Sequence, residues 1–389
     1  MTARRTIVCL SSQNFGDPLW TNKQHIMSRL AEQHRVLHVD FRPLSAHAMA
    51  RRKLAASPAA ALRPLDLFLT PRVEVERGVE VVQLYAPEAI YLFPFGHPLR
   101  TLGSFDLHTL LLERHLEREG IRDAILWVYH PGFGDRVARL PHSLLVYDCV
   151  DEYAAFPDYR DCKDWIRRRE AALCRAADLV FCTAPPLFAS KRALNPHGTH
   201  LVENVGDAEH FALARAAETR VPGELAALPR PIIGFVGAVS DYKLDTGWVL
   251  ELARARPHFT IVLIGPVGLA DPSTDVRALQ RAPNVRLLGV RDYGSLPGYL
   301  KGFDVAVIPY RINDYTRAVF PIKFFEFLAT GKPVVLSNLP SLEAFYDDVL
   351  VARDAAEFVA RVDQALADPE AGRARRIALA EEHSWPARV

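Results

Sequence analysis

Two charged residues, Lys323 and Glu326, interrupt an otherwise apolar segment, PIKFFEFLAT, that starts at Pro321. Because they are three positions apart, a helix places both side chains on the same side. An ammonium group at the start of a helix favours a phosphate ligand, since the unpaired N–H groups there carry partial positive charge. A carboxylate one turn further along can accept hydrogen bonds from the vicinal hydroxyls of a ribose. The pair therefore predicts a nucleotide site. The alternative is a surface ion pair worth about 0.2–0.5 kcal/mol.

A second candidate for phosphate binding, Lys243, lies in the glycine-containing loop GFVGAVSDYKLDTG. Gly234 and Gly237 let the backbone turn closely after an apolar strand, and a lysine in such a loop suits a pyrophosphate. The alternative is a solvated loop cation. The Walker pattern G-x-x-x-x-G-K-[ST] and the dinucleotide pattern G-x-G-x-x-G are both absent from this loop. Their absence argues against an NTPase and against an ordinary dehydrogenase.

Carboxylates that could act as a general base occur in the segment LLVYDCVDEY, where Asp148 and Asp151 follow an apolar run. One of them could take the proton from an attacking hydroxyl, and two close together would raise one pKa toward the useful range. The alternative is a pair of aspartates that cap the loop backbone. His130 is a second candidate base or a hydrogen-bond donor to the substrate, with a structural histidine as the alternative. Asp17 and Trp20, in the first loop, are expected to line the same edge and contact the acceptor.

The composition describes a soluble globular protein of two domains. The chain has 389 residues, of which 49% are hydrophobic and 24% charged, and its net charge of +1 gives no case for nucleic acid. No apolar segment is long enough to span a bilayer. Five cysteines without a C-x-x-C pair indicate reduced thiols in the cytoplasm. Neither D-x-D nor H-E-x-x-H occurs, so we expect no metal and no cofactor, with phosphate charge met by lysines and helix ends.

Strands and helices alternate along the chain, which predicts parallel sheets with crossover helices. In the first half, strands are expected over 6–10, 36–41, 79–85, 125–129, 144–150, 179–183 and 201–205, and helices over 20–32, 107–119 and 165–177. In the second half, strands are expected over 232–236, 260–264, 285–288, 305–309 and 334–336, and helices over 246–255, 295–301, 321–330 and 355–367. In the helix over 321–330, Pro321 is expected at the first helical position, and Gly331 just past its end.

This alternation predicts an α/β fold with two Rossmann-like domains facing across a cleft. The first is expected over residues 1–206 and the second over 231–370, with an alanine-rich linker over 207–230. A last helix over 371–389 is expected to pack back toward the first domain. In open α/β sheets, ligands bind at the carboxyl ends of the strands, so the cleft is expected to hold the active site.

Several segments resemble the GT-B-type group 1 glycosyltransferases, family 4 and its relatives. In the second half these are PIKFFEFLATGKPVV and GFVGAV; in the first half, YDCVDEYAAFP, AADLVFCTAPPLF and VENVGDAEHF; and at the end, HSWPARV. The resemblance covers most of the chain except residues 42–77, and is strongest to bacterial polysaccharide enzymes of the teichuronic-acid and glucuronosyltransferase kind. It implies a GT-B fold and transfer of a sugar, without bound metal, from a nucleotide-diphosphate donor to an acceptor hydroxyl. We expect a UDP-sugar as donor.

The resemblance also assigns residues to roles. Glu326 matches the second glutamate of the family's E-x7-E motif, which binds the donor ribose, and Lys243 matches the phosphate-binding loop lysine, which Lys323 joins. Two departures are Ala318, where many relatives have the other glutamate, and Ala238, which replaces an arginine. Retention and inversion both stay open.

An inverting reaction would require a base, for which Asp151 is preferred with Asp148 behind it. Donor contacts are further expected from Gly237, from Pro321 and from the loop that precedes the helix. The loop residues are Tyr310, Asn313, Thr316 and Arg317, which could replace the missing sugar contacts.

The acceptor is expected to be a saccharide or a lipid-linked saccharide. Residues 42–77 carry an RRK triplet at 51–53, and the segment YLFPFGHPLR spans 91–100. Together they could form a basic and aromatic rim that contacts anionic lipid, placing the enzyme at the inner face of the plasma membrane. The alternative is a solvated loop with a packed hairpin. Two rival functions are a sugar-nucleotide epimerase on the same scaffold and a non-catalytic nucleotide-sugar-binding scaffold protein, which Ala318 keeps open.

Overall fold

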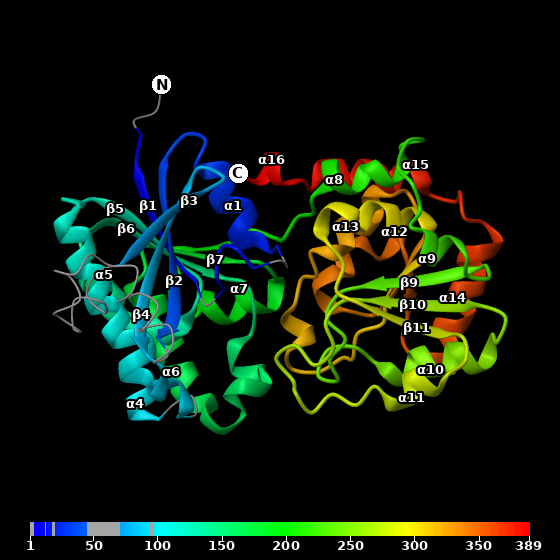
Figure 1. Ribbon diagram of the computed structural model, residues 1–389, viewed down its shortest axis with the longest axis horizontal. Helices are drawn as coiled ribbons and strands as arrows, with labels where there is room; N and C mark the ends of the chain where they lie inside the picture. The colour runs from blue at the N-terminus through cyan, green and yellow to red at the C-terminus, as the bar shows by residue number, and fades with distance from the viewer. Residues whose placement is uncertain (1–3, 12, 18–19, 45–70, 94–96) are drawn as a thin grey trace, which may run out of the picture. The chain divides into compact units, whose positions relative to one another are not determined.

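The computed structural model describes residues 4–11, 13–17, 20–44, 71–93 and 97–389 (Figure 1). Its contacts divide the chain into two compact units, Met1–Val202 and Glu203–Val389. The sequence places the end of the first domain at residue 206 and a linker at 207–230, but by contacts these residues belong to the second unit. The RRK triplet at 51–53 lies outside the described residues.

The described part of the first unit forms an eight-stranded sheet with the order β3-β4-β2-β1-β5-β6-β7-β8. All neighbouring strands are parallel except β3, which pairs antiparallel with β4. The strand order reverses beside β1, which lies between β2 and β5. The strands are β1 (Thr6–Leu10), β2 (Arg35–Leu44), β3 (Arg72–Glu76), β4 (Val79–Pro87), β5 (Ala124–Val128), β6 (His142–Cys149), β7 (Leu179–Cys182) and β8 (Thr199–Leu201).

The helices of this unit connect successive parallel strands, as a doubly wound topology requires. They are α1 (Asn22–Leu30), α4 (Pro98–Thr101), α5 (Leu107–Arg118), α6 (Lys163–Ala176) and α7 (Pro185–Arg192), with a 3-10 segment over Pro131–Arg139. Helix α1 starts after the loop that follows β1. Its start is fixed because the Thr21 N–H donates to Gln24 Oε1 at 3.1 Å, and Gln24 Nε2 donates to the Asn14 carbonyl at 3.3 Å.

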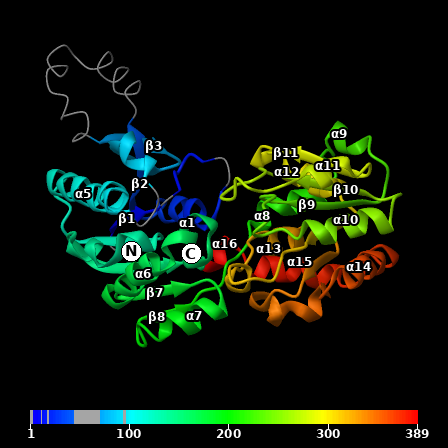
Figure 2. The same cartoon turned by 90° about the horizontal axis from the view of Figure 1, so that it is seen from below.

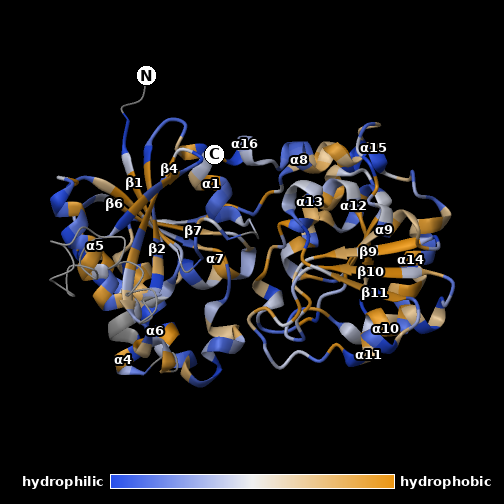
Figure 3. Cartoon of the chain, in the orientation of Figure 1, coloured by the Kyte–Doolittle hydropathy of each residue, from blue (hydrophilic) through white to orange (hydrophobic). Residues whose placement is uncertain are grey.

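The second unit contains a six-stranded parallel sheet with the order β11-β10-β9-β12-β13-β14. Here the order reverses beside β9. The strands are β9 (Ile232–Val236), β10 (Thr260–Ile264), β11 (Val285–Gly289), β12 (Val305–Ile308), β13 (Val334–Ser337) and β14 (Leu350–Ala352). Strands β9 and β10 are predominantly hydrophobic (Figure 3), and β10 is buried along its whole length, as expected for a sheet covered on both faces.

Helices cover both faces of this second sheet. Figure 1 shows α12 (Leu296–Gly302) and α13 (Lys323–Ala329) on one face, and α10 (Thr246–Ala255) and α11 (Arg277–Arg281) on the other. Helix α14 (Ala355–Ala367) packs beside α10 (Figure 2). The remaining helices are α8 (Ala208–Ala212), α9 (Gly223–Ala226), α15 (Arg373–Glu382) and α16 (Trp385–Arg388).

Several expectations from the sequence need correction. The strand expected over 201–205 is β8, which ends at Leu201; beyond its end, the Asn204 side-chain amide donates to the Phe320 carbonyl at 2.8 Å. Helix α13 begins at Lys323, so Pro321 precedes the helix. The single helix expected over 371–389 is two helices, α15 and α16, and α15 packs on α13 within the second unit. Its packing on the first domain stays a prediction.

Strands β3 and β14 and helices α4, α7 and α11 have no counterpart in the sequence analysis. Strand β3 alternates charged and apolar residues at the sheet edge and is exposed along its length. Its sequence therefore lacks the apolar pattern by which a buried strand is predicted. Within the described segments, no helix combines the length and the apolar character that crossing a bilayer requires.

Candidate active site

The side chains of α13 divide into a buried and a half-buried side. Phe324, Phe325, Phe327 and Leu328 are at most 1% exposed and fix the helix against the sheet and its neighbours. Lys323 and Glu326 are only half-buried, so the two charged residues occupy the side that the apolar positions leave open. The sequence pattern that predicts this division is confirmed.

The Lys323 ammonium lies among aromatic rings. Its Nζ donates to the Tyr310 hydroxyl at 2.9 Å and lies 5.7 Å from the Phe235 ring centroid. Burial lowers the pKa of Lys323, and Glu326 partly opposes this effect. Gly237 has a φ of 150°, and a Cβ there would lie 2.7 Å from Lys323 Cε. The absence of a side chain at Gly237 therefore leaves the space through which Lys323 passes.

A second ammonium group, that of Lys243, lies near the same tyrosine. Its Nζ is 5.3 Å from the Tyr310 ring centroid and 5.6 Å from that of Tyr315. The Lys323 Nζ is 5.6 Å from the Tyr310 centroid. Among the described residues, neither lysine forms an ion pair within 4 Å. Two unpaired cations thus converge on one tyrosine, and such an arrangement can bind two phosphate groups.

Glu326 lies near a second carboxylate, Asp207, from the stretch that follows β8. Burial raises the pKa of Glu326 to about 7; Lys323 opposes this rise and Asp207 adds to it. Tyr293 donates its hydroxyl to Asp207 Oδ2 at 3.1 Å. The stretch packs closely on α13, because a Cβ on Gly206 would lie 2.8 Å from the Glu326 backbone nitrogen. Sequence reasoning did not select Asp207, although its segment, VENVGDAEHF, carries part of the family resemblance.

The loop between β12 and α13 is held by its own polar side chains. The backbone N–H groups of Tyr315 and Thr316 donate to Asn313 Oδ1 at 3.0 Å, and Asn313 Nδ2 donates to the Tyr242 carbonyl at 2.7 Å. The Thr316 hydroxyl donates to the Arg311 carbonyl and is fully buried. Thr316 thus shapes the loop, whereas Arg317 is exposed. Donor contacts by these two residues and by Pro321 stay predictions.

In the first unit, Asp148 and Asp151 lie at and just beyond the carboxyl end of β6. Asp148 is fully buried, and its Oδ2 accepts a hydrogen bond from Trp127 Nε1 at 3.1 Å. Asp151 is half-buried and therefore the more accessible of the two. Both carboxylates interact electrostatically with Lys23 of α1, which sequence reasoning did not select. The greater accessibility of Asp151 favours it over Asp148 as the candidate base.

His130 has both ring nitrogens occupied. Its Nδ1 accepts from the Gly132 N–H at 2.9 Å, so Nε2 carries the hydrogen and donates to the Tyr159 hydroxyl at 2.6 Å. Burial, with Lys23 and Arg169 as smaller causes, lowers the pKa of His130 to about 3. A neutral, fully bonded imidazole at the start of a 3-10 segment has the contacts of a structural histidine. Its catalytic role stays a prediction.

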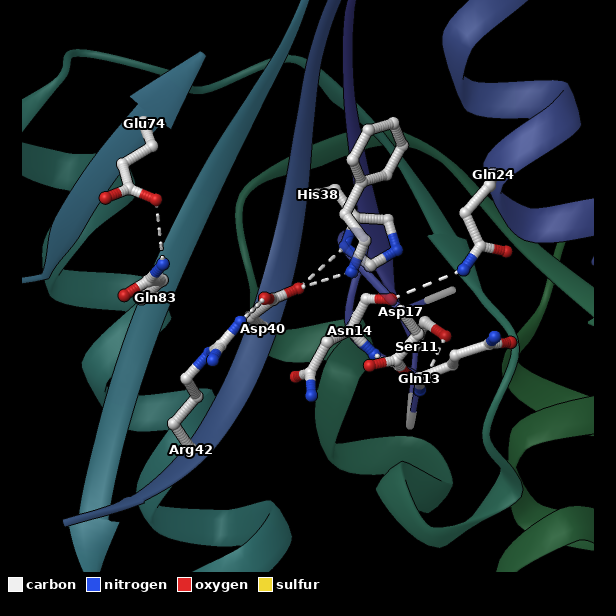
Figure 4. A network of polar contacts seen from close by, with 11 residues as sticks. Ser11, Gln13, Asn14, Asp17, Gln24, His38, Asp40, Arg42, Glu74 and Gln83 are labelled. Carbon is white, nitrogen blue, oxygen red and sulfur yellow. Dashed lines mark hydrogen bonds and ion pairs between the residues drawn. The ribbon is translucent and has the colours of Figure 1, made fainter. Parts of the chain in front are cut away.

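Asp17 belongs to a polar network that shapes the loop after β1 (Figure 4). Its Oδ2 accepts from the Asn14 N–H at 3.1 Å. The same loop is tied to β2 by Asp40, which accepts from the Phe15 N–H at 3.0 Å and from Arg42 at 2.7 Å. Burial would raise the pKa of Asp40, but hydrogen bonds from His38, Arg42 and Phe15 lower it below its usual range.

Trp20 lies in the same part of the first unit and is partly covered. The guanidinium of Arg77 lies 4.3 Å from the Trp20 ring, and the His25 ring lies 5.1 Å away in an edge-on arrangement. Contact of Asp17 and Trp20 with an acceptor stays a prediction. Across the described part of the chain, no group of three or more His, Cys, Asp or Glu side chains is arranged to hold a metal ion.

Two doubly wound, mainly parallel sheets in series define the GT-B architecture, and comparison with solved structures agrees. An Escherichia coli protein described as trehalose-6-phosphate bound with UDP-2-fluoro glucose superposes with a TM-score of 0.70 over 98% of this chain and 97% of its own, at 12% identity. Sucrose-phosphate synthase of Thermosynechococcus elongatus gives 0.67 over 99% and 96%, at 16% identity. Anabaena HepE in complex with UDP gives 0.67 over 99% and 97%, at 14% identity.

Sequence comparison points in the same direction. Residues 230–368 match the family model described as glycosyl transferases group 1. TuaH of Bacillus subtilis, named as a teichuronic acid biosynthesis glycosyltransferase, is 30% identical over 261 residues, which make up 64% of this chain and 64% of TuaH. The resemblance seen in the sequence is therefore confirmed.

Proposed function

We propose that the protein is a glycosyltransferase that moves a sugar from a UDP-sugar to an acceptor hydroxyl in bacterial polysaccharide synthesis. The observation that carries this proposal is the convergence of Lys243 and Lys323 on Tyr310, beside Gly237, whose lack of a side chain makes room for Lys323. A UDP-sugar bears two negative charges on its diphosphate, which two unpaired ammonium groups can neutralise. The family match and the name of the relative TuaH support the same conclusion.

The donor would be held by three residues of the second unit. Lys243 and Lys323 would pair with the diphosphate and stabilise the negative charge that develops on it as UDP leaves. Glu326 would accept hydrogen bonds from the ribose hydroxyls. The UDP and the UDP-sugar analogue in two of the similar structures support a uridine nucleotide.

The transfer step forms a bond between the acceptor oxygen and the anomeric carbon and breaks the bond from that carbon to the diphosphate oxygen. UDP departs with the bonding electrons, and the acceptor proton passes to a base. We assign the role of base to Asp151, because it is the accessible carboxylate at the end of β6, whereas Asp148 is buried and bonded to Trp127. No metal is required in this scheme.

The acceptor would be a saccharide, free or linked to lipid, and the enzyme would work in the cytoplasm at the inner face of the plasma membrane. Exposed apolar side chains near the predicted rim support a lipid contact, since Leu92 is 82% and Leu99 47% exposed. Arg100 stacks on Tyr91 at 4.5 Å nearby. Flotation with anionic liposomes tests this contact: neutralising Arg51, Arg52 and Lys53 should abolish flotation, and unchanged flotation would refute it.

Two assays on the purified chain test the proposed function. Calorimetry should show UDP binding that weakens in Lys323→Ala and Glu326→Gln but not in Glu343→Gln, a matched control at an exposed glutamate of the same unit. Product analysis should show a transferred sugar in the presence of an acceptor. Release of UDP with an epimerised sugar and no acceptor would instead identify an epimerase. Binding without turnover for any acceptor would identify a non-catalytic protein.

A further inference from the structure

A buried lysine of the first unit, Lys23, has no role in the scheme above. It lies in the first turn of α1 and is 7% exposed. Its Nζ lies 5.5 Å from the ring centroid of Tyr129. Among the described residues, its ammonium group makes no hydrogen bond and no ion pair within 4 Å. Burial of an ammonium group without a bonded partner is unfavourable and needs an explanation.

A second buried lysine of the same unit shows how a structural lysine is accommodated. Lys191 is 4% exposed, and its Nζ lies 2.8 Å from Glu170 Oε2 and 3.6 Å from Glu152 Oε2. Tyr147 donates its hydroxyl to the other oxygen of Glu170 at 2.6 Å, which completes a closed network. Lys23 has no such partner among the described residues, although it is nearly as buried as Lys191. The difference indicates that the partner of Lys23 is not a side chain among the residues that the structure describes.

The location of Lys23 indicates where that partner would lie. Helix α1 starts after the carboxyl end of β1, beside which the strand order of the sheet reverses. Tyr129 follows β5, and Asp148 ends β6. In open α/β sheets, ligands bind at this edge, beside the point of reversal. The titratable groups that act on Lys23 are Asp151, Asp148 and Cys9, with Asp151 the strongest; burial raises the pKa of the Cys9 thiol, so the two aspartates are the charged neighbours.

We propose that Lys23 belongs to the acceptor site, where its ammonium group donates a hydrogen bond to the acceptor oxygen that Asp151 deprotonates. This inference rests on the proposed function. A hydroxyl group can accept from an ammonium while it donates to a carboxylate, so one saccharide hydroxyl satisfies both groups. As its proton moves to Asp151, the oxygen becomes more negative, and the ammonium stabilises it without giving up a proton. Lys23 is then a catalytic residue, and saccharide hydroxyls are its ligand class.

The alternative is that Lys23 only balances the charge of Asp148 and Asp151 and so holds the fold together. The two explanations predict opposite effects of Lys23→Met on stability. A ligand-directed ammonium without a bonded partner costs stability, so Lys23→Met should keep or raise the midpoint of thermal unfolding. If Lys23 is instead a counter-ion, Lys23→Met should lower the midpoint. Lys191→Met is the matched control and should lower the midpoint, because it leaves Glu170 buried without its partner.

The kinetic test uses the full chain, UDP-glucose as donor, and water or octyl glucoside as acceptor. Lys23→Met should bind UDP as the unmodified chain does, since the donor residues lie in the other unit. UDP release to either acceptor should fall about 10- to 100-fold, and Lys23→Arg should recover part of the loss. Unchanged UDP release, or a midpoint that falls as in Lys191→Met, overturns the role of Lys23. Absence of UDP binding by the unmodified chain would instead refute the proposed function.

Discussion

The pKa of Glu326 makes donor binding depend on pH in a range that is easy to measure. Burial, with Asp207 as a further cause, raises this pKa to about 7 from an ordinary value of 4.5. In the ligand-free protein, Glu326 is then about 90% ionised at pH 8 and about 10% ionised at pH 6. A ribose needs the carboxylate as hydrogen-bond acceptor. We therefore expect the affinity for UDP-glucose to fall about tenfold from pH 8 to pH 6.

The assay is isothermal titration calorimetry with UDP-glucose, whose diphosphate does not titrate in this range, unlike the terminal phosphate of UDP. At pH 6, binding should release a proton from Glu326. The number of released protons is measured by repeating the titration in buffers of different ionisation enthalpy. Burial lowers the pKa of Lys323. Loss of its proton would weaken binding as the pH rises, whereas protonation of Glu326 weakens binding as the pH falls. Glu326→Gln should abolish the acid-side dependence, and Glu343→Gln should keep it.

The same pKa predicts an effect on stability. Since folding raises the pKa of Glu326, its stabilising contribution is fully present below about 4.5 and is lost as the pH rises through about 7. The difference corresponds to at most about 3.5 kcal/mol, because one pKa unit equals about 1.4 kcal/mol. Glu326→Gln should therefore raise stability more at pH 8 than at pH 5. Affinity that is independent of pH, or an equal slope in Glu326→Gln, would refute the reasoning.

Three further predictions concern single side chains. Lys323→Ala should weaken UDP binding about 10- to 100-fold, because it removes one of two charged hydrogen-bond donors from the diphosphate; unchanged calorimetric affinity would contradict this. Gly237→Ala should weaken UDP binding too, since its methyl group would lie 2.7 Å from Lys323 Cε and displace that side chain; the control is Gly289→Ala in the same unit, which also has a positive φ but where a Cβ meets nothing within 4 Å. Asp151→Asn should bind UDP normally but lose at least about 100-fold in transfer rate, and full activity would exclude Asp151 as the base.

The sequence predicts the second unit more closely than the first, for physical reasons. Strands such as β9 and β10 are buried on both faces, so their apolar runs mark their limits. Lys323 and Glu326 can be selected as candidate site residues from the sequence, because they are the charged residues within an apolar helical segment. The start of α13 was misplaced because Pro321 suits a first helical position, whereas the helix begins two residues later. Strand β3 was missed because exposed edge strands carry no burial pattern.

Asp207 and Lys23 could not be selected from the sequence, because their significance arises from long-range packing. Asp207 gains its role from the approach of the Gly206 stretch to Glu326, far away in the sequence. Lys23 lies in the polar segment TNKQH, in which a lysine is ordinarily exposed. Only the fold buries it. A local signal exists for neither residue, although the family resemblance of VENVGDAEHF marks the neighbourhood of Asp207.

Three lysines share a setting that separates them from the cations that hold the fold. The ammonium groups of Lys23, Lys243 and Lys323 each lie within 6 Å of a tyrosine ring, and none is ion-paired with a described carboxylate. A cation–π contact contributes only about 0.5–2 kcal/mol and leaves the N–H donors largely available. A carboxylate partner such as Glu170 would compete directly with an incoming oxygen. An aromatic face therefore holds an ammonium group in position without occupying its N–H donors. A phosphate or a hydroxyl can then bind without displacing a carboxylate partner, which favours ligand-directed roles for all three lysines.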